Sequence, residues 1–204
     1  MIVSIITIVF RQGQSQLPDR KQNTKGKLKM KSKRVKRICF IGLIAGIYAM
    51  TTILLAPISF GNLQCRVSEA LTLLAILCPE AIIGVTLGCA ISNAISVAMG
   101  ASIIGVLDIF VGTIATLLAG IVSYACRTIR VKNIPILSAL APVIFNGIFI
   151  GAELAFVIAP DTFWMMFFIC GLEVAMGEAV ACLVLGVPLV LRLEKLKVME
   201  KLKL

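Results

Sequence analysis

The chain has 204 residues, of which 59% are hydrophobic, and it carries a formal net charge of +10 with a mean hydropathy of +1.03. Its apolar stretches are longer than soluble core helices and leave too little polar surface for a water-soluble fold. They are also unbroken and rich in Gly and Ala, which excludes an outer-membrane barrel of short alternating strands. The composition therefore predicts an all-α membrane protein.

The basic residues gather at the two ends of the chain. Eleven Lys and Arg precede Ile38, and five more follow Leu191. Short basic flanks are retained in the cytoplasm by the positive-inside rule, and they can contact anionic lipid headgroups. No aromatic interleaving or motif accompanies them, so we expect no nucleic-acid binding. We predict a disordered basic cytoplasmic segment over residues 1–37 and a basic cytoplasmic tail over 193–204.

The first residues do not resemble part of the fold. Residues 1–10 are apolar, but they are too short to span a bilayer and lack the basic region that opens a signal peptide. Met30 opens the sequence MKSKRVKR directly before the first long apolar segment. We therefore expect translation to begin at Met30 and residues 1–29 to be untranslated.

Six apolar segments make up one membrane domain over residues 38–192. The second and third segments are separated at Pro79, because proline is favourable at the start of a helix and unfavourable inside it. The predicted spans are 38–58, 65–78, 80–99, 103–126, 134–158 and 163–191.

The basic residues between the spans test this count. With six spans, both basic ends lie on the same side as the loop that carries Arg127, Arg130 and Lys132, and this side is the cytoplasm. The loops at 100–108 and 158–163, on the opposite side, contain no Lys or Arg. Five spans would place one basic end outside. We predict a six-helix bundle with both termini cytoplasmic.

Seven carboxylates lie in the apolar body of the chain, against four basic residues. A carboxylate at bilayer depth is costly unless it faces a bundle interior, a partner or a cavity, so it indicates a functional site. We interpret Glu80, after a helix-starting proline, and Asp161, in an APDTF turn, as helix-end residues. Glu153 and Glu178 have no basic residue in their own spans and are the strongest ligand candidates. The seven are Glu69, Glu80, Asp108, Glu153, Asp161, Glu173 and Glu178.

The Arg66–Glu69 pair and Trp164 have two interpretations each, and Glu173 has no assigned role. Arg66 and Glu69, three residues apart, either neutralise each other or contact a ligand. Trp164 either stacks on a bound ring or anchors the helix at the membrane interface. Glu173 lies about 140° around the helix from Glu178, so both cannot face the same partner, and its role stays open.

No catalytic or metal-binding pattern is present in the sequence. The chain has no His, and its seven Cys are scattered singly without a CxxC pair, so we expect neither a zinc site nor a disulfide framework. It also lacks the GxSxG, HExxH, Walker A and dinucleotide-loop motifs. We therefore expect no enzyme activity, no metal, no cofactor and no energy source of its own.

Five separated runs carry a family resemblance over residues 38–195. They are FGNLQCRVSEALTLL (60–74), PEAIIGVTLGCAISN (79–93), GVLDIFVGTIATLLAG (105–120), APVIFNGIFIGAEL (141–154) and MGEAVACLVLGVPLV (176–190). In this order they resemble the queuosine-precursor transporter family QueT. Its members are substrate-specificity (S) components of energy-coupling factor (ECF) transporters.

The resemblance implies a six-helix S component in a prokaryotic cytoplasmic membrane. It implies binding of a 7-deazaguanine such as queuine or preQ1, and association with one transmembrane coupling protein and two ATPases. The free base, aminomethyl and nitrile forms are not distinguished by any residue in the sequence. One alternative is an S component for riboflavin, thiamine or biotin, and another is an integral membrane subunit without a transport role.

The chemistry of such a ligand matches the polar residues of the spans. A 7-deazaguanine presents an N1–H and an exocyclic amine that one carboxylate can accept together, and a carbonyl that needs a donor such as Asn. Asn146 and Glu153, seven residues apart, point the same way along their helix. The expected substrate-binding residues are Glu69, Asn93, Asp108, Asn146, Glu153, Glu178, Gln64 and Arg66. The expected docking face for the coupling protein is Gly42, Ala45, Gly46 and Ala49.

Overall fold

The computed structural model describes residues 23–59, 65–102 and 104–202, with side chains described within these ranges from Lys33 to Glu200. It divides into two units, one of Met1–Cys39 with Leu204 and one of Phe40–Lys203. In the described residues the secondary structure is helical, and a single isolated bridge joins Val131 to Ile134. The all-helical prediction is confirmed.

The first unit contributes the start of helix α2 (Asn23–Leu54). The sequence predicts disorder up to Arg37, whereas residues 23–37 are helical in the structure. The Lys, Arg and Met residues of this stretch are good helix formers. Lys33 and Arg34 are exposed, and residues 1–22 lie outside the described part of the chain.

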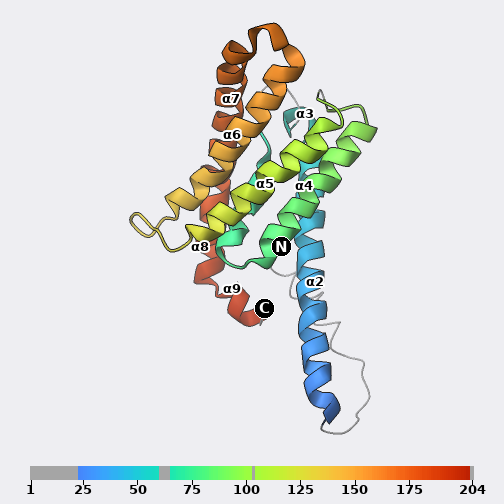
Figure 1. Cartoon of the computed structure of the whole chain (residues 1–204). Helices are drawn as coiled ribbons and strands as arrows, with labels where there is room; N and C mark the ends of the chain where they lie inside the picture. The colour runs from blue at the N-terminus through green and yellow to red at the C-terminus, as the bar shows by residue number, and fades with distance from the viewer. Residues whose placement is uncertain (1–22, 60–64, 103, 203–204) are drawn as a thin grey trace. The chain divides into compact units, whose positions relative to one another are not determined.

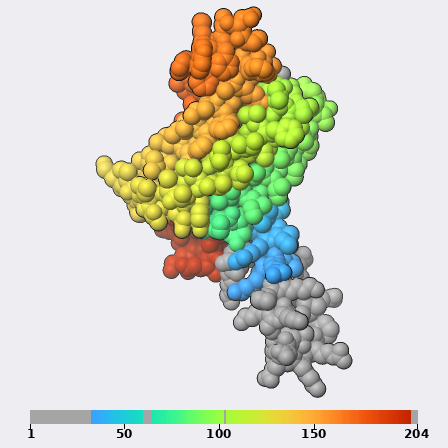
Figure 2. All heavy atoms as spheres, viewed as in Figure 1, coloured from blue at the N-terminus to red at the C-terminus, as the bar shows by residue number. Residues whose placement is uncertain are grey.

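The second unit contains the remaining helices, and Figure 1 shows their order. The long helices α4, α5 and α6 lie side by side and form one face of this unit in Figure 2. The elements after α2 are α3 (Ala56–Ser59), η1 (Val67–Ile76), α4 (Glu80–Ala98), α5 (Leu107–Ala125), α6 (Ile136–Ile158), η2 (Pro160–Thr162), α7 (Phe163–Ala179), η3 (Val180–Gly186), α8 (Val187–Lys195) and α9 (Val198–Leu202).

Five segments of the described chain are long and apolar enough to cross a membrane. They are Lys33–Leu54, Glu80–Ala98, Leu107–Ala125, Ile136–Ile158 and Pro160–Lys195. Large apolar side chains such as Phe110, Ile114, Ile144 and Ile148 remain about half exposed on these helices. Exposed apolar faces on long helices are typical of contact with lipid, and the chain is a multi-pass membrane protein.

The predicted second span is the short helix η1. It is a 3-10 helix of 10 residues, of which all but Val67 and Leu71 are buried. At about 2.0 Å per residue it is roughly 20 Å long, shorter than the 30 Å apolar core of a bilayer. The break after it is confirmed, because Pro79 precedes α4 and Glu80 lies in its first turn.

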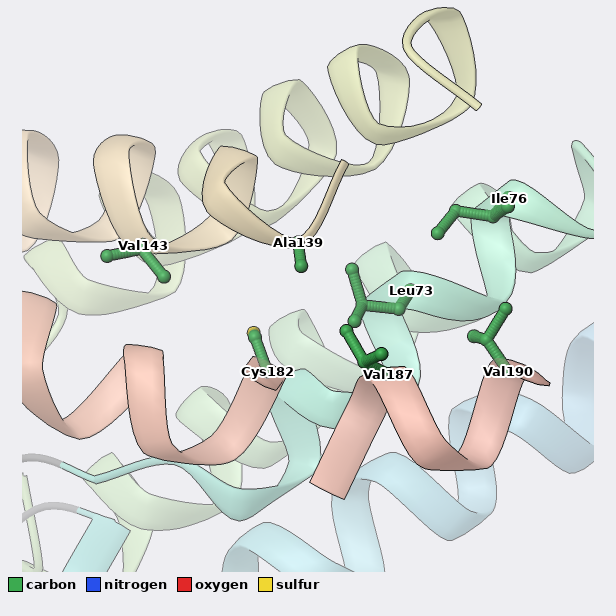
Figure 3. Close-up of a cluster of buried hydrophobic side chains, with 7 residues drawn as sticks. All are labelled: Leu73, Ile76, Ala139, Val143, Cys182, Val187 and Val190. Atoms are coloured by element: carbon green, nitrogen blue, oxygen red, sulfur yellow. The ribbon is translucent and has the colours of Figure 1, made fainter. Parts of the chain in front are cut away.

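Helix η1 nevertheless runs from one end of the bundle towards the other. Arg66, at its start, pairs with Asp108 in the first turn of α5. Near its end, Leu73 and Ile76 pack in an apolar cluster with Ala139, in the first turns of α6. The side chains of this cluster point towards one another from η1, α6, η3 and α8 (Figure 3). Because α5 and α6 follow each other in opposite directions, their first turns lie at opposite ends of the bundle.

Small residues allow α2 and α4 to cross closely. A Cβ added at Gly88 would lie 2.7 Å from the Tyr48 Cβ and 2.9 Å from the Ala45 carbonyl oxygen. Ala45 and Ala49 are therefore buried, with 5% and 6% of their surface exposed. Of the predicted docking face, these two positions are covered by helix packing in this structure. Gly42 and Gly46 are exposed, and a Cβ added at either would have no neighbour within 4 Å.

The loop between α5 and α6 is held against α8 by an ion pair. Arg130 donates from Nη1 to Glu194 Oε2 at 2.9 Å and from Nη2 to Glu194 Oε1 at 2.5 Å. Hydrogen bonding to this carboxylate raises the pKa of Arg130. The turn within the loop places Lys132 and Asn133 at φ values of 50° and 68°, a left-handed conformation that Asn adopts more readily than most residues.

Candidate functional site

A buried polar cluster lies in the second unit between η1 and helices α2, α4, α5, α6 and α7. In the described part of the chain, all buried charged side chains belong to it, and each is no more than 6% exposed. They are Arg66, Glu69, Asp108, Glu153 and Glu178. Four carboxylates thus share the interior with one guanidinium, and this set contains the four carboxylates that the sequence selects as a ligand-binding group.

The Glu69 carboxylate is fully engaged by the protein. Its Oε1 accepts hydrogen bonds from Tyr48 at 2.5 Å and from Thr116 at 2.9 Å, and its Oε2 accepts one from Thr72 at 2.6 Å. These donors come from α2, α5 and η1 itself, so the carboxylate joins three elements. A neighbouring bond, from Thr52 to the Ser68 hydroxyl at 2.7 Å, also joins α2 to η1.

Asp108 is the ion-pair partner of the buried arginine. Arg66 Nη2 lies 2.9 Å from both carboxylate oxygens of Asp108. Asn93 on α4 adds a hydrogen bond from its Nδ2 to the Asp108 backbone carbonyl at 2.7 Å. The open question about Arg66 is thereby answered: its ion pair is with Asp108, while three hydroxyl groups bind Glu69.

Gly112 makes room for this arrangement. It lies one turn after Asp108 on the buried face of α5. A Cβ added there would lie 2.7 Å from Asn93 Nδ2, 2.9 Å from Asp108 Oδ1 and 3.3 Å from Arg66 Nη1. Only a residue without a side chain lets these three polar groups meet at the helix surface.

The other two carboxylates have oxygen atoms without a hydrogen-bond partner. Both oxygens of Glu153 on α6 are buried and unpartnered, and so is Oε2 of Glu178 on α7. Asn146 is close enough to Glu178 to interact with it. Its Nδ2 nevertheless has no hydrogen-bond partner. Buried polar groups normally have partners, so these atoms indicate a site for a bound molecule.

Close packing of α6 against α7 brings these groups to the interior. A Cβ added at Gly151 would lie 2.5 Å from the Gly171 Cα, and one at Gly147 would lie 3.2 Å from the Ala175 Cβ. The two helices therefore approach through small residues, as membrane helices commonly do. The predicted polar stripe of α6 is buried, because Asn146 and Glu153 are 3% and 6% exposed.

The cluster is coupled electrostatically across its elements. Glu153 interacts with Asp108 and Arg66, while Glu178 interacts with Glu69 and Arg66. Arg66 thus acts electrostatically on both unpartnered carboxylates. A molecule that reached this cluster would meet unpartnered acceptor groups on α6 and α7.

The remaining predicted residues lie elsewhere. Gln64 falls outside the described residues. Glu80 lies in the first turn of α4 and Asp161 is exposed in η2, as expected for helix-end residues. Trp164 is 72% exposed and packs edge-on against Phe163, with ring centroids 5.3 Å apart. This exposure favours an anchor at the membrane interface over a stacking role.

An open groove of about 340 Å³ between α6 and α7 is separate from the polar cluster. Its lining is hydrophobic, and Ile144, Ile148, Phe168 and Leu172 within it are at least half exposed. It offers no side-chain hydrogen-bond donor or acceptor to a polar ligand. This surface is suited to lipid.

Sequence reasoning missed the residues that organise the cluster. Tyr48, Thr72, Thr116 and Gly112 are absent from the predicted set. One signal was available: Asp108, Gly112 and Thr116 follow one another at intervals of four, which places them on one helix face. Tyr48 carried no such signal, because its partner is 21 residues away in the chain.

Comparison with known proteins gives two matches. The model of the family described as QueT transporter matches residues 38–195. The protein named Queuosine precursor transporter QueT from Lactococcus lactis subsp. cremoris (strain MG1363) is 37% identical over 90 residues, which are 43% of this chain and 49% of that protein. The match thus spans about half the length of this relative. No solved structure matches the chain.

Proposed function

Because the chain belongs to the QueT transporter family, we propose that it is the membrane-embedded substrate-binding subunit of an ECF transporter that imports a 7-deazaguanine precursor of queuosine. The observation that carries this proposal is the set of unpartnered polar atoms on α6 and α7. A buried acceptor without a donor is destabilising by about 1–3 kcal/mol. A donor-rich heterocycle would satisfy these groups when it binds.

The pair formed by Asn146 and Glu178 suits the polar edge of a deazaguanine. The edge carries a carbonyl oxygen beside an N1–H and an exocyclic amine. Asn146 Nδ2 is a free donor for the carbonyl, and Glu178 Oε2 is a free acceptor for the N–H groups. The name of the similar Lactococcus lactis protein, Queuosine precursor transporter QueT, agrees with this chemistry. A flavin or thiamine would need a different donor and acceptor pattern.

The path of η1 supports six membrane passes with both termini in the cytoplasm. Its ends contact the first turn of α5 and the first turns of α6, which lie at opposite ends of the bundle. With η1 as the second pass, the basic loop at Arg130 and the tail after Leu191 lie on the same side. This is the side that the positive-inside rule assigns to the cytoplasm, here that of a prokaryotic cell membrane.

Transport would then depend on partner proteins. The sequence contains no nucleotide-binding motif, so two ATPases would supply the energy through a transmembrane coupling protein. The exposed Gly42 and Gly46 form the part of the predicted docking face that remains accessible on α2. Small residues four apart allow close approach of a second membrane helix.

Mass spectrometry of molecules retained after gentle purification tests the proposal. A retained 7-deazaguanine supports it, whereas a retained flavin or thiamine supports another vitamin S component. Calorimetry then measures the affinity for the 7-deazaguanine. Glu178→Gln is expected to weaken binding at least 10-fold, which is about 1.4 kcal/mol.

The matched control is Glu173→Gln. Glu173 lies five residues before Glu178 on the same helix and is half-buried outside the cluster. It is expected to bind the ligand with wild-type affinity. Equal weakening in both variants, or none in either, would remove Glu178 from the site.

A further inference from the structure

The unpartnered carboxylates occupy two separate positions in the site. Glu178 lies opposite Asn146, while Glu153 lies seven residues further along α6. Seven helical residues correspond to about 10 Å along the axis. The two carboxylates therefore do not serve one group of the ligand, and each needs its own donor.

The two positions differ in chemistry. At the Asn146–Glu178 end, a donor and an acceptor stand together, which matches a ligand edge that carries both an acceptor and donors. At the Glu153 end, both carboxylate oxygens lack a partner and Glu153 is only 6% exposed. An ammonium group, with three donors and a positive charge, matches such a carboxylate best.

No side chain of the described residues forms a hydrogen bond with Glu153, although Arg66 acts on it electrostatically. In the described interior the only buried basic side chain is Arg66, and its Nη2 lies 2.9 Å from both oxygens of Asp108. Glu69 has its three hydroxyl donors. A ligand cation would therefore find two carboxylate oxygens at Glu153 without a hydrogen-bond partner.

We propose, on the basis of the proposed function, that Glu153 binds a protonated amine on the ligand while Asn146 and Glu178 bind the polar edge of its base. Glu153 then determines specificity: it selects aminomethyl-substituted 7-deazaguanines over neutral forms. The aminomethyl group is on the five-membered ring beside the carbonyl that Asn146 would bind, and the exocyclic amine that Glu178 would bind is on the far side of the pyrimidine ring. This placement agrees with the axial separation of the two carboxylates.

The test measures the affinities of three ligands for the purified full-length protein. These are the 7-aminomethyl, 7-hydroxymethyl and 7-cyano forms of 7-deazaguanine, of which only the first carries a charge. The wild-type protein is expected to bind the aminomethyl form at least 10-fold more tightly than each neutral form. The hydroxymethyl form is close in size to the aminomethyl form, so this comparison tests charge without a change in the protein.

Two variants test which carboxylate binds the charged amine of the ligand. Glu153→Gln is expected to weaken only the aminomethyl ligand and to reduce its preference below 3-fold, whereas Glu178→Gln is expected to weaken all three ligands by a similar factor. Thermal unfolding in detergent confirms that each variant is folded. If Glu153→Gln does not fold, Glu153→Asp, which keeps the charge, is expected to retain the preference.

Four results would overturn the proposal. Equal binding of the charged and neutral ligands by the wild type would remove the selection, although the proposed function would stand. Loss of the preference in Glu178→Gln, or its retention in Glu153→Gln, would contradict the assignment to Glu153. Binding of none of the three ligands by the folded wild type would contradict the proposed function as well.

Discussion

Replacing Gly112 by Ala is expected to disable the binding site without breaking helix α5. The added Cβ would lie 2.7 Å from Asn93 Nδ2 and 2.9 Å from Asp108 Oδ1. Both distances are shorter than an ordinary van der Waals contact, so these groups must move. They are buried and bonded to one another, since Asn93 donates to the Asp108 carbonyl and Arg66 holds the Asp108 carboxylate.

The size of the effect follows from the bonds that must shift. A neutral hydrogen bond contributes about 1 kcal/mol, and one to a charged group about 1.5–3 kcal/mol. Alanine is better than glycine in a helix by about 1 kcal/mol, which offsets part of the loss. We expect Gly112→Ala to lower the free energy of unfolding by about 1–3 kcal/mol. Displacement of Arg66 and Asp108 is expected to weaken ligand binding at least 10-fold, or about 1.4 kcal/mol.

Thermal unfolding in detergent and calorimetric titration with the 7-deazaguanine measure the two effects. Gly42→Ala is the matched control, because it also places Ala in a membrane helix but has no atom within 4 Å of the added Cβ. It should keep wild-type affinity and gain up to about 1 kcal/mol of stability. A folded Gly112→Ala protein with wild-type affinity would refute the reasoning that these polar groups support the site.

Three further predictions concern the docking face and the charges. Gly46→Trp should fold and bind ligand but lose uptake, whereas Ala45→Trp should fail to fold because Ala45 is buried against α4. Size-exclusion chromatography tests folding, and an uptake assay tests transport. Normal uptake with Gly46→Trp would contradict docking at this face. Thr116→Val, which removes the 2.9 Å bond to Glu69, should destabilise the protein by about 1 kcal/mol, and unchanged thermal unfolding would contradict it. Glu178→Leu should raise the melting temperature of the ligand-free protein and abolish stabilisation by ligand; a lower melting temperature would indicate an internal partner.

The long helices could be predicted from the sequence because hydrophobic length alone reports them. The break at Pro79 and the acidic first turn at Glu80 were local signals, and both are confirmed. The 3-10 conformation of η1 could not be predicted from hydrophobicity, because its 10 residues would form an equally apolar α-helix. The packing of the surrounding helices determines the conformation and the burial of η1. Residues 23–37 are helical, in keeping with the helix propensity of their Lys, Arg and Met residues.

The buried carboxylates of the candidate site could be predicted from the sequence, but their hydrogen-bond donors could not. Buried carboxylates are visible in a hydrophobic sequence because their cost in lipid is high. Their hydrogen-bond partners are not visible, since Tyr48 and Thr116 lie 21 and 47 residues from Glu69. Only the tertiary structure shows that Glu69 is satisfied and Glu153 is not.

The small residues of α2 also show that sequence spacing alone does not identify a packing partner. Gly42 and Gly46 have the same four-residue spacing as Ala45 and Ala49, so the pattern cannot tell which stripe faces a neighbour. The packing of α4 decides it, because Gly88 approaches the Ala45 carbonyl and leaves the glycine stripe open. A spacing motif predicts that a close contact can form, and the fold determines whether that contact is internal.

The four buried carboxylates therefore divide by function according to their partners. Glu69 and Asp108 have complete internal partners and hold η1, α2, α4 and α5 together around the site. Glu153 and Glu178 keep oxygen atoms unpartnered at a cost to the stability of the free protein. A ligand present at 100 times its Kd stabilises a protein by about 2.7 kcal/mol, which is comparable to that cost. If the proposed ligand binds these oxygen atoms, their lack of internal partners favours the bound state over the empty one.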